Sequence, residues 1–200
     1  MLSACKAIAI GRSAAQIRTI VRLATIAGFG IIETPEKGDA PAPHALICFV
    51  LVHEQVGDAL LRHVISAIRG GAQEVRFSPI VVLGNDCPFE QVLHFVHLGV
   101  DDVISLPEKR EVLIQRLCQQ LWTEQAYFET NDYFGPDRRR YEAADDGLRT
   151  GLVAHTRYDI QRLPDVGTRI VRHQIHSRRV GPPPPPVGSQ RGVGLAFARL

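Results

Sequence analysis

The segment from Pro79 to Pro107 constrains the fold most, because it places two short apolar runs around one helical pattern in few residues. It begins with the β-prone run PIVVL, continues to an amphipathic stretch at 89–98, and ends in the β-branched run 102–106. Gly99 follows the helical stretch, where a residue in the left-handed conformation commonly ends a helix. The segment therefore predicts two parallel strands that are joined by a helical crossover.

The same alternation extends over the rest of the first 122 residues. Apolar β-prone runs occupy 5–10, 29–34 and 45–52, and helical spacing occupies 13–28, 55–70 and about 107–122. The third run, ALICFVLV, is apolar throughout, which is typical of a central strand that is covered on both faces. The sequence therefore predicts an α/β fold with a five-stranded parallel sheet, alternating βα units and helices on both faces, the flavodoxin-like arrangement.

Charge divides the chain into two parts. Residues 1–130 carry 11 Lys and Arg against 14 Asp and Glu, whereas residues 131–200 carry 12 against 7. The second part contains the low-complexity run GPPPPPVGSQRGVG, whose prolines favour an extended polyproline II conformation. We therefore expect one folded domain over 1–130, followed by a basic, Pro-rich and largely disordered extension over 131–200. The charge of this extension suits an acidic partner, nucleic acid or a membrane surface.

Two segments resemble a known family. The elements over about residues 3–122, and above all LGVDDVISLP, resemble the receiver domains of two-component response regulators. That family has a small residue, a Gly, an acidic pair, a β-branched strand, a lysine and a proline there, and Leu106 stands in place of the lysine. The run YFGPDRRR at 133–140 resembles a short motif in the extensions of some bacterial receiver-like proteins. The resemblance implies the same flavodoxin-like fold.

The resemblance also implies that the phosphorylation chemistry has been lost. A receiver domain needs an acidic pair, an aspartate, a hydroxyl and a lysine at its strand ends, because phosphoryl transfer to a carboxylate gathers negative oxygens that cations must neutralise. The corresponding positions in this chain are Gly11, Arg12, Val50, Gly84 and Leu106. We therefore expect no phosphorylation, no cofactor and no metal, with the Arg12 guanidinium as a hypothetical replacement for a magnesium ion.

Four further polar residues fall at predicted strand ends: His53, Glu54, Asn85 and Asp86. Ligands bind at the carboxyl ends of strands in open parallel sheets, but loop residues there are also polar simply because they face water, which is the interpretation we prefer. The sequence contains no nucleophile–base pair, phosphate-binding glycine loop or metal-ligand cluster, so it predicts no enzyme.

Composition bears on where the protein acts. The four cysteines form no C-x-x-C pair, and three lie within apolar runs, which indicates buried thiols in a reducing compartment. No run approaches the ~20 apolar residues of a membrane span. We therefore expect a cytoplasmic protein without a membrane contact.

Two functions are consistent with these features. The first is a signalling adaptor of a bacterial phosphorelay or regulatory pathway that binds a protein partner, or a second copy of itself. The resemblance implies that it would use the surface of the fourth helix, fifth strand and fifth helix, whose candidate residues are Val96, Val100, Val103, Val112 and Gln115. The second is a nucleic-acid-associated regulator that uses the basic extension. The candidate anion-binding residues there are Arg138, Arg139 and Arg140, whose planar donors suit phosphate or carboxylate.

Overall fold

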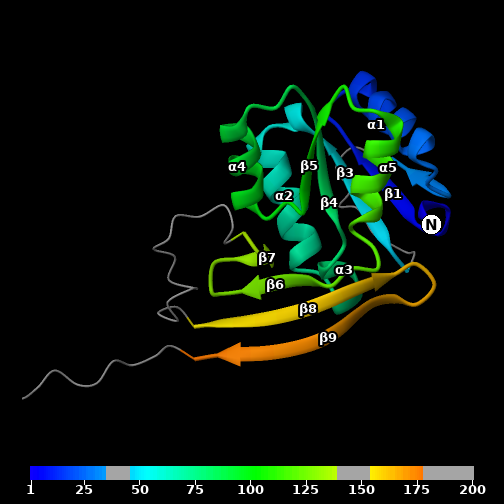
Figure 1. Cartoon of the computed structure of the whole chain (residues 1–200). Helices are drawn as coiled ribbons and strands as arrows, with labels where there is room; N and C mark the ends of the chain where they lie inside the picture. The colour runs from blue at the N-terminus through cyan, green and yellow to red at the C-terminus, as the bar shows by residue number, and fades with distance from the viewer. Residues whose placement is uncertain (35–45, 139–153, 178–200) are drawn as a thin grey trace, which may run out of the picture.

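A computed structural model of the 200-residue chain describes residues 1–34, 46–138 and 154–177 (Figure 1). Its first sheet contains five parallel strands: β1 (Lys6–Ile10), β2 (Ile31–Glu33), β3 (Cys48–His53), β4 (Ile80–Asn85) and β5 (Asp102–Leu106). They lie in the order β2-β1-β3-β4-β5, with every neighbouring pair parallel. This order is that of the flavodoxin-like fold, so the predicted fold class is confirmed for this sheet.

Helices cover both faces of the parallel sheet. The helical elements are η1 (Leu2–Ala4), α1 (Ala14–Ala27), η2 (Glu54–Val56), α2 (Asp58–Arg69), α3 (Gln73–Arg76), α4 (Phe89–Leu98) and α5 (Arg110–Cys118). One buried cluster joins apolar side chains of α1 and α5 to one face of the sheet, and a second joins those of α2 and α4 to the other face. The strands in the middle are buried on both sides, as their continuous apolar runs predict.

Local signals explain both ends of α1. The Ser13 side chain accepts a hydrogen bond from the Gln16 N–H at 3.3 Å and begins α1, and Gly28 ends it at φ 88°. The last helix is shorter than predicted, because α5 ends at Cys118 and Trp122 lies in the left-handed region at φ 67°. The Trp122 N–H donates to the Arg162 carbonyl, so this residue already belongs to the connection into a second sheet.

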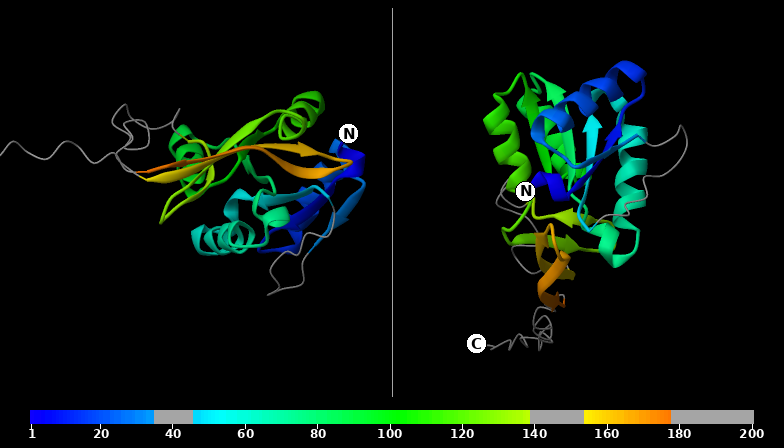
Figure 2. Two further views of the ribbon diagram at one scale, coloured as in Figure 1. Left: turned by 90° about the horizontal axis from the view of Figure 1, so that it is seen from below. Right: turned by 90° about the vertical axis from the view of Figure 1, so that its right-hand side faces the viewer.

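The second sheet is antiparallel and corrects the prediction of a disordered extension. Its strands are β6 (Gln125–Glu129), β7 (Phe134–Pro136), β8 (His155–Leu163) and β9 (Gly167–His176), in the order β7-β6-β8-β9. It lies below the parallel sheet, with β8 and β9 running across the underside (Figures 1 and 2). The predicted boundary at residue 130 falls in the turn between β6 and β7, so 1–130 is not a complete structural unit. The proline run and residues 139–153 lie outside the described residues.

An aromatic cluster holds the second sheet against α3. The Phe77 side chain is 1% exposed and contacts the rings of Tyr127, Phe134 and Tyr158 at centroid distances of 5.3, 5.4 and 5.6 Å. The Arg76 guanidinium lies 3.8 Å from the centroid of the Phe134 ring. Burial of these rings explains why the antiparallel strands form here, since a hairpin in isolation is at best marginally stable.

Candidate functional site

The carboxyl edge of the parallel sheet gathers most of the residues that the sequence singled out there. Gly11 and Arg12 follow β1, and β4 and β5 bring Gly84 and Leu106 to the same edge through the pairs Gly84–Ser105 and Asn85–Leu106. Val50 does not lie there. It is fully buried in the middle of β3, between Ile8 and Ile80, because the strand continues to His53. The prediction that placed Val50 at the end of the third strand is therefore wrong.

Glu54, the first residue after β3, reaches across to the end of β4. Its Oε1 accepts a hydrogen bond from the Asn85 N–H at 2.9 Å, and its Oε2 accepts one from the Cys87 thiol at 3.2 Å. Burial and the hydrogen bond to Glu54 raise the pKa of Cys87 to about 11, so the thiol remains a donor at neutral pH. Glu54 and Asn85 were expected to be separate, solvated loop residues. In the structure they are hydrogen-bonded to each other, and Cys87 is hydrogen-bonded to the same carboxylate.

Gly84 has a steric reason to lack a side chain. A Cβ atom at this position would overlap Glu54 Oε2 and Cys87 Sγ, and it would lie 2.8 Å from Glu54 Cδ. A hydroxyl side chain at position 84 and the observed position of the Glu54 carboxylate therefore exclude each other. The absence of a side chain at position 84 therefore makes room for the Glu54 carboxylate.

Arg12 lies at the same edge with an exposed side chain. Its backbone N–H donates to Gln16 Oε1 at 2.7 Å, and its Nη1 atom lies beside Gly57. Within residues 1–34, 46–138 and 154–177, no carboxylate forms an ion pair with its guanidinium. Its role as a replacement for a metal ion stays a hypothesis.

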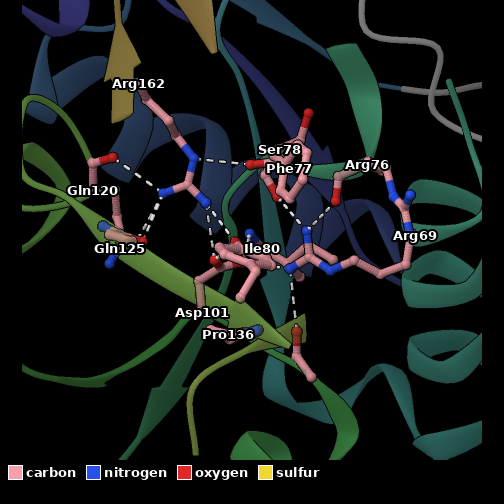
Figure 3. A network of polar contacts seen from close by, with 12 residues as sticks. Arg69, Arg76, Phe77, Ser78, Ile80, Asp101, Gln120, Gln125, Pro136 and Arg162 are labelled. Atoms are coloured by element: carbon pink, nitrogen blue, oxygen red, sulfur yellow. Dashed lines mark hydrogen bonds and ion pairs between the residues drawn. The ribbon is translucent and has the colours of Figure 1, made fainter. Parts of the chain in front are cut away.

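The opposite, amino edge of the sheet holds a buried polar network around Asp101 (Figure 3). Asp101 Oδ2 accepts hydrogen bonds from Arg69 Nη2 at 2.6 Å and from the Ile80 N–H at 2.7 Å. Its Oδ1 accepts from Arg162 Nη2 at 3.0 Å and from the Tyr127 hydroxyl. One carboxylate thereby joins α2, β4, β6 and β8, and its side chain is only 1% exposed.

The two arginines also satisfy backbone carbonyls that would otherwise be buried without a partner. Arg162 donates to the carbonyls of Phe77 and Gln120 at 2.8 and 3.1 Å, and to Gln125 Oε1 at 2.9 Å. Arg69 donates to the carbonyls of Arg76, Ser78 and Gly99, at 2.9, 2.8 and 3.2 Å. The second sheet is therefore bonded into the domain.

Burial by itself would raise the pKa of Asp101, but the charges of Arg69 and Arg162 outweigh it and hold that pKa below its ordinary value. Sequence reasoning noted Asp101 only as half of an acidic pair and missed both arginines. The signal that could have found Arg162 is the turn Pro164-Asp165-Val166-Gly167 between two β-prone runs, which is typical of a hairpin.

The predicted interaction face is largely buried. Val96, Val100 and Val103 are 8%, 1% and 6% exposed, because they pack α4 and β5 against the core, so they cannot form a contact surface. Val112 is partly buried and Gln115 is exposed on α5. The large apolar side chain that this region does expose is Phe89, at 64%.

Arg138 contacts the domain itself. Its guanidinium lies 4.1 Å from the centroid of the Tyr133 ring, and its Nη1 donates to the His97 carbonyl at 3.0 Å. These contacts place the first residues of the YFGPDRRR run on the end of α4. Arg139 and Arg140 lie outside the described residues.

Two general findings concern the described part of the chain. It contains no group of three or more His, Cys, Asp and Glu side chains that could hold a metal ion. None of its helices has the length and apolar character that crossing a membrane requires.

The sequence matches no protein-family model, and no curated protein is similar to it. Among solved structures, the chain is similar to a pilus assembly-related protein of Burkholderia pseudomallei, with 12% identity, a TM-score of 0.46, and coverage of 60% of this chain and 91% of that one. A response regulator in red light signalling of R. palustris has 14% identity, a TM-score of 0.37, and coverage of 57% and 89%. NtrX from Brucella abortus has 17% identity, a TM-score of 0.38, and coverage of 58% and 26%.

The strand order defines the class of the first 122 residues as a flavodoxin-like α/β domain. An antiparallel sheet is attached at the amino edge of this domain.

Proposed function

We propose that this chain is a cytoplasmic signalling adaptor whose receiver-like domain accepts no phosphoryl group and acts by binding a partner protein in a bacterial phosphorelay or regulatory pathway. One observation carries the proposal: the Glu54 carboxylate fills the space beside Gly84 at the carboxyl edge and binds Asn85 and Cys87. A negative group already occupies the region where a transferred phosphoryl group would need donors and cations.

The neighbouring residues also support a domain that accepts no phosphoryl group. Gly11 and Arg12 follow β1 without a carboxylate, and Leu106 supplies no ammonium group at the end of β5. Phosphoryl transfer depends on positioned cations around the reacting oxygens, and these residues do not offer such a set. We therefore assign the domain no enzymatic activity.

The accessible partner surface lies on α4 and α5. Val96, Val100 and Val103 are buried, so the side chains that α4 and α5 offer to a partner are others, among them the aromatic Phe89 at the start of α4 and the polar Gln115 on α5. An exposed aromatic side chain beside polar ones is a common anchor in protein interfaces. The same surface would serve a homodimer.

Incubation of the full chain with magnesium and acetyl phosphate tests the first half of the proposal. We expect no phosphoryl adduct in the intact mass spectrum, with an active receiver domain treated in parallel as the positive control. A stoichiometric adduct that hydroxylamine removes would contradict the proposal, because it would show an acyl phosphate.

Affinity capture from a lysate of the source organism tests the second half. The full chain should retain a reproducible partner, and the double substitution Phe89→Ala and Gln115→Arg should lose it. The matched control is Arg169→Glu, an exposed position on β9 far from this surface, which should retain the partner. Equal capture by all three proteins would place the contact elsewhere.

The exposed strand β9 favours a second candidate function, that of a nucleic-acid-associated regulator. Arg169, Arg172, His173 and His176 lie on this strand without an acidic residue, and residues 171–177 are all exposed. Binding of labelled duplex DNA or RNA that weakens steeply with salt, and that Arg169→Glu with Arg172→Glu abolishes, would support this candidate. The adaptor predicts no such binding.

A further inference from the structure

The Glu54 carboxylate is bound by the loop that joins β4 to α4, much as an anion is bound in a site. Both of its oxygens are used, one by the Asn85 backbone N–H at 2.9 Å and the other by the Cys87 thiol at 3.2 Å. Hydrogen bonds to an ionised acceptor are stronger than those between neutral groups. This contact therefore ties the end of β3 to the loop after β4.

The same loop is held from its other side by β5. The Cys87 N–H donates to Ser105 Oγ at 2.9 Å, and the Asp86 N–H donates to the Leu106 carbonyl at 3.1 Å. Asp86 adopts a left-handed conformation at φ 47°, which aspartate tolerates better than most residues other than glycine. The loop is thus fixed between two strands in one defined backbone conformation.

The first turn of α4 depends on this loop. Pro88 precedes the helix without a side-chain capping bond, and the N–H groups of Gln91 and Val92 both donate to the Pro88 carbonyl at 3.0 Å. No side-chain cap bond fixes the start of the helix, so residues 85–88 lead the chain into its first turn, while Phe95 and Val96 pack the rest of the helix into the core. Phe89, the first residue of α4, is 64% exposed and is carried by that turn.

We propose that Glu54 is a built-in anion that fixes the β4–α4 loop and thereby holds the first turn of α4, with Phe89, in one position. Gly84 is the matching residue, because any side chain there would displace the carboxylate. The inference rests on the proposed function, because it takes the surface around Phe89 to be the partner-binding surface and to keep one conformation. Glu54 acts here as a positioning residue.

Hydrogen–deuterium exchange of the full chain tests this proposal without any partner. In Glu54→Ala, the amides of residues 84–92 should exchange roughly tenfold faster, because two hydrogen bonds to a charged group are lost. Peptides from β1 and β6 should exchange at the rate of the unsubstituted chain. The matched control is Gln55→Ala, the exposed neighbour in η2, which should leave residues 84–92 unchanged.

A second variant separates the carboxylate from general loosening. Gly84→Ala should increase exchange in residues 84–92 to a similar degree, because the new Cβ overlaps Glu54 Oε2 and Cys87 Sγ. In the double variant Glu54→Ala with Gly84→Ala, the increase in exchange should be smaller than the sum of the two single increases. The reason is that Glu54 Oε2, one of the atoms that the new Cβ overlaps, is then absent. Unchanged exchange in Glu54→Ala, or strictly additive effects, would overturn the proposal.

The outcomes distinguish this inference from the proposed function. A phosphoryl adduct on the full chain, together with faster exchange in Glu54→Ala, would remove the adaptor proposal and leave the role of Glu54 intact. No adduct, together with unchanged exchange in Glu54→Ala, would remove the role of Glu54 and leave the adaptor proposal intact.

Discussion

Asp101 and Asp102 are adjacent in sequence and differ sharply in what they contribute. The Asp101 carboxylate lies between two guanidinium groups whose side chains are 5% and 1% exposed, whereas Asp102 pairs with Arg116, whose side chain is 34% exposed. Asp101→Asn should lower the free energy of unfolding by about 3–5 kcal/mol, because it leaves buried positive charge uncompensated. Asp102→Asn, the matched control, should lower it by less than about 1 kcal/mol. Urea unfolding of both variants measures the difference, and equal losses would contradict it.

The same carboxylate predicts a pH dependence. The pKa of Asp101 is held below its ordinary value by Arg69 and Arg162 despite its burial. Its contribution to stability is therefore fully present above the unfolded-state pKa of about 4 and is lost as the pH falls through the lower folded-state pKa. The free energy of unfolding should fall steeply below about pH 4 in the unsubstituted chain and less steeply in Asp101→Asn. Parallel slopes in the two proteins would contradict this assignment.

At the scale of elements, the strand β7 packs closely on the end of α4 through two glycines. A Cβ on Gly135 would lie 2.5 Å from the Tyr133 hydroxyl oxygen and 3.3 Å from Gly99 Cα. Gly135→Ala should therefore cost about 1–3 kcal/mol through overpacking. In a Tyr133→Ala background the same change should cost clearly less, because the ring is gone. Thermal unfolding of the four proteins completes the cycle, and equal costs in both backgrounds would show that the ring is not the obstacle.

The elements differ in how far sequence could predict them. The five parallel strands were predictable because each is a short apolar run bounded by turn formers, and burial on both faces requires that composition. The hairpin of β8 and β9 was harder to predict. Its turn at 164–167 is typical of a hairpin, but a buried arginine at Arg162 and an aspartate at Asp159 interrupt the apolar alternation, and the register shifts between Asp159 and Ile160. Likewise, the contacts of Glu54 could not be predicted, because they depend on how far β3 extends.

Across the whole molecule, the two edges of the parallel sheet are separated in role. The amino edge is covered by the second sheet and held by the Asp101 network, while the carboxyl edge carries Glu54 and the start of α4. The attached sheet meets α4 at its C-terminal end, at His97 and Gly99, whereas Phe89 lies at the opposite end of that helix. We therefore expect that removal of the second sheet destabilises the parallel sheet and its helices.

Truncation tests this dependence of the whole fold on its last two strands. A chain that ends at residue 153 loses Arg162 and Ile160, which exposes Phe77 and Tyr127 and leaves the carbonyls of Phe77 and Gln120 without their donor. It should be less stable by at least about 3 kcal/mol, bind a hydrophobic dye and unfold with reduced cooperativity. A chain that ends at Ser177 keeps all of these contacts and is the matched control. If the shorter chain melted at the same temperature as the control with no dye binding, the parallel sheet and its helices would be an independent domain, and the network would only attach the second sheet.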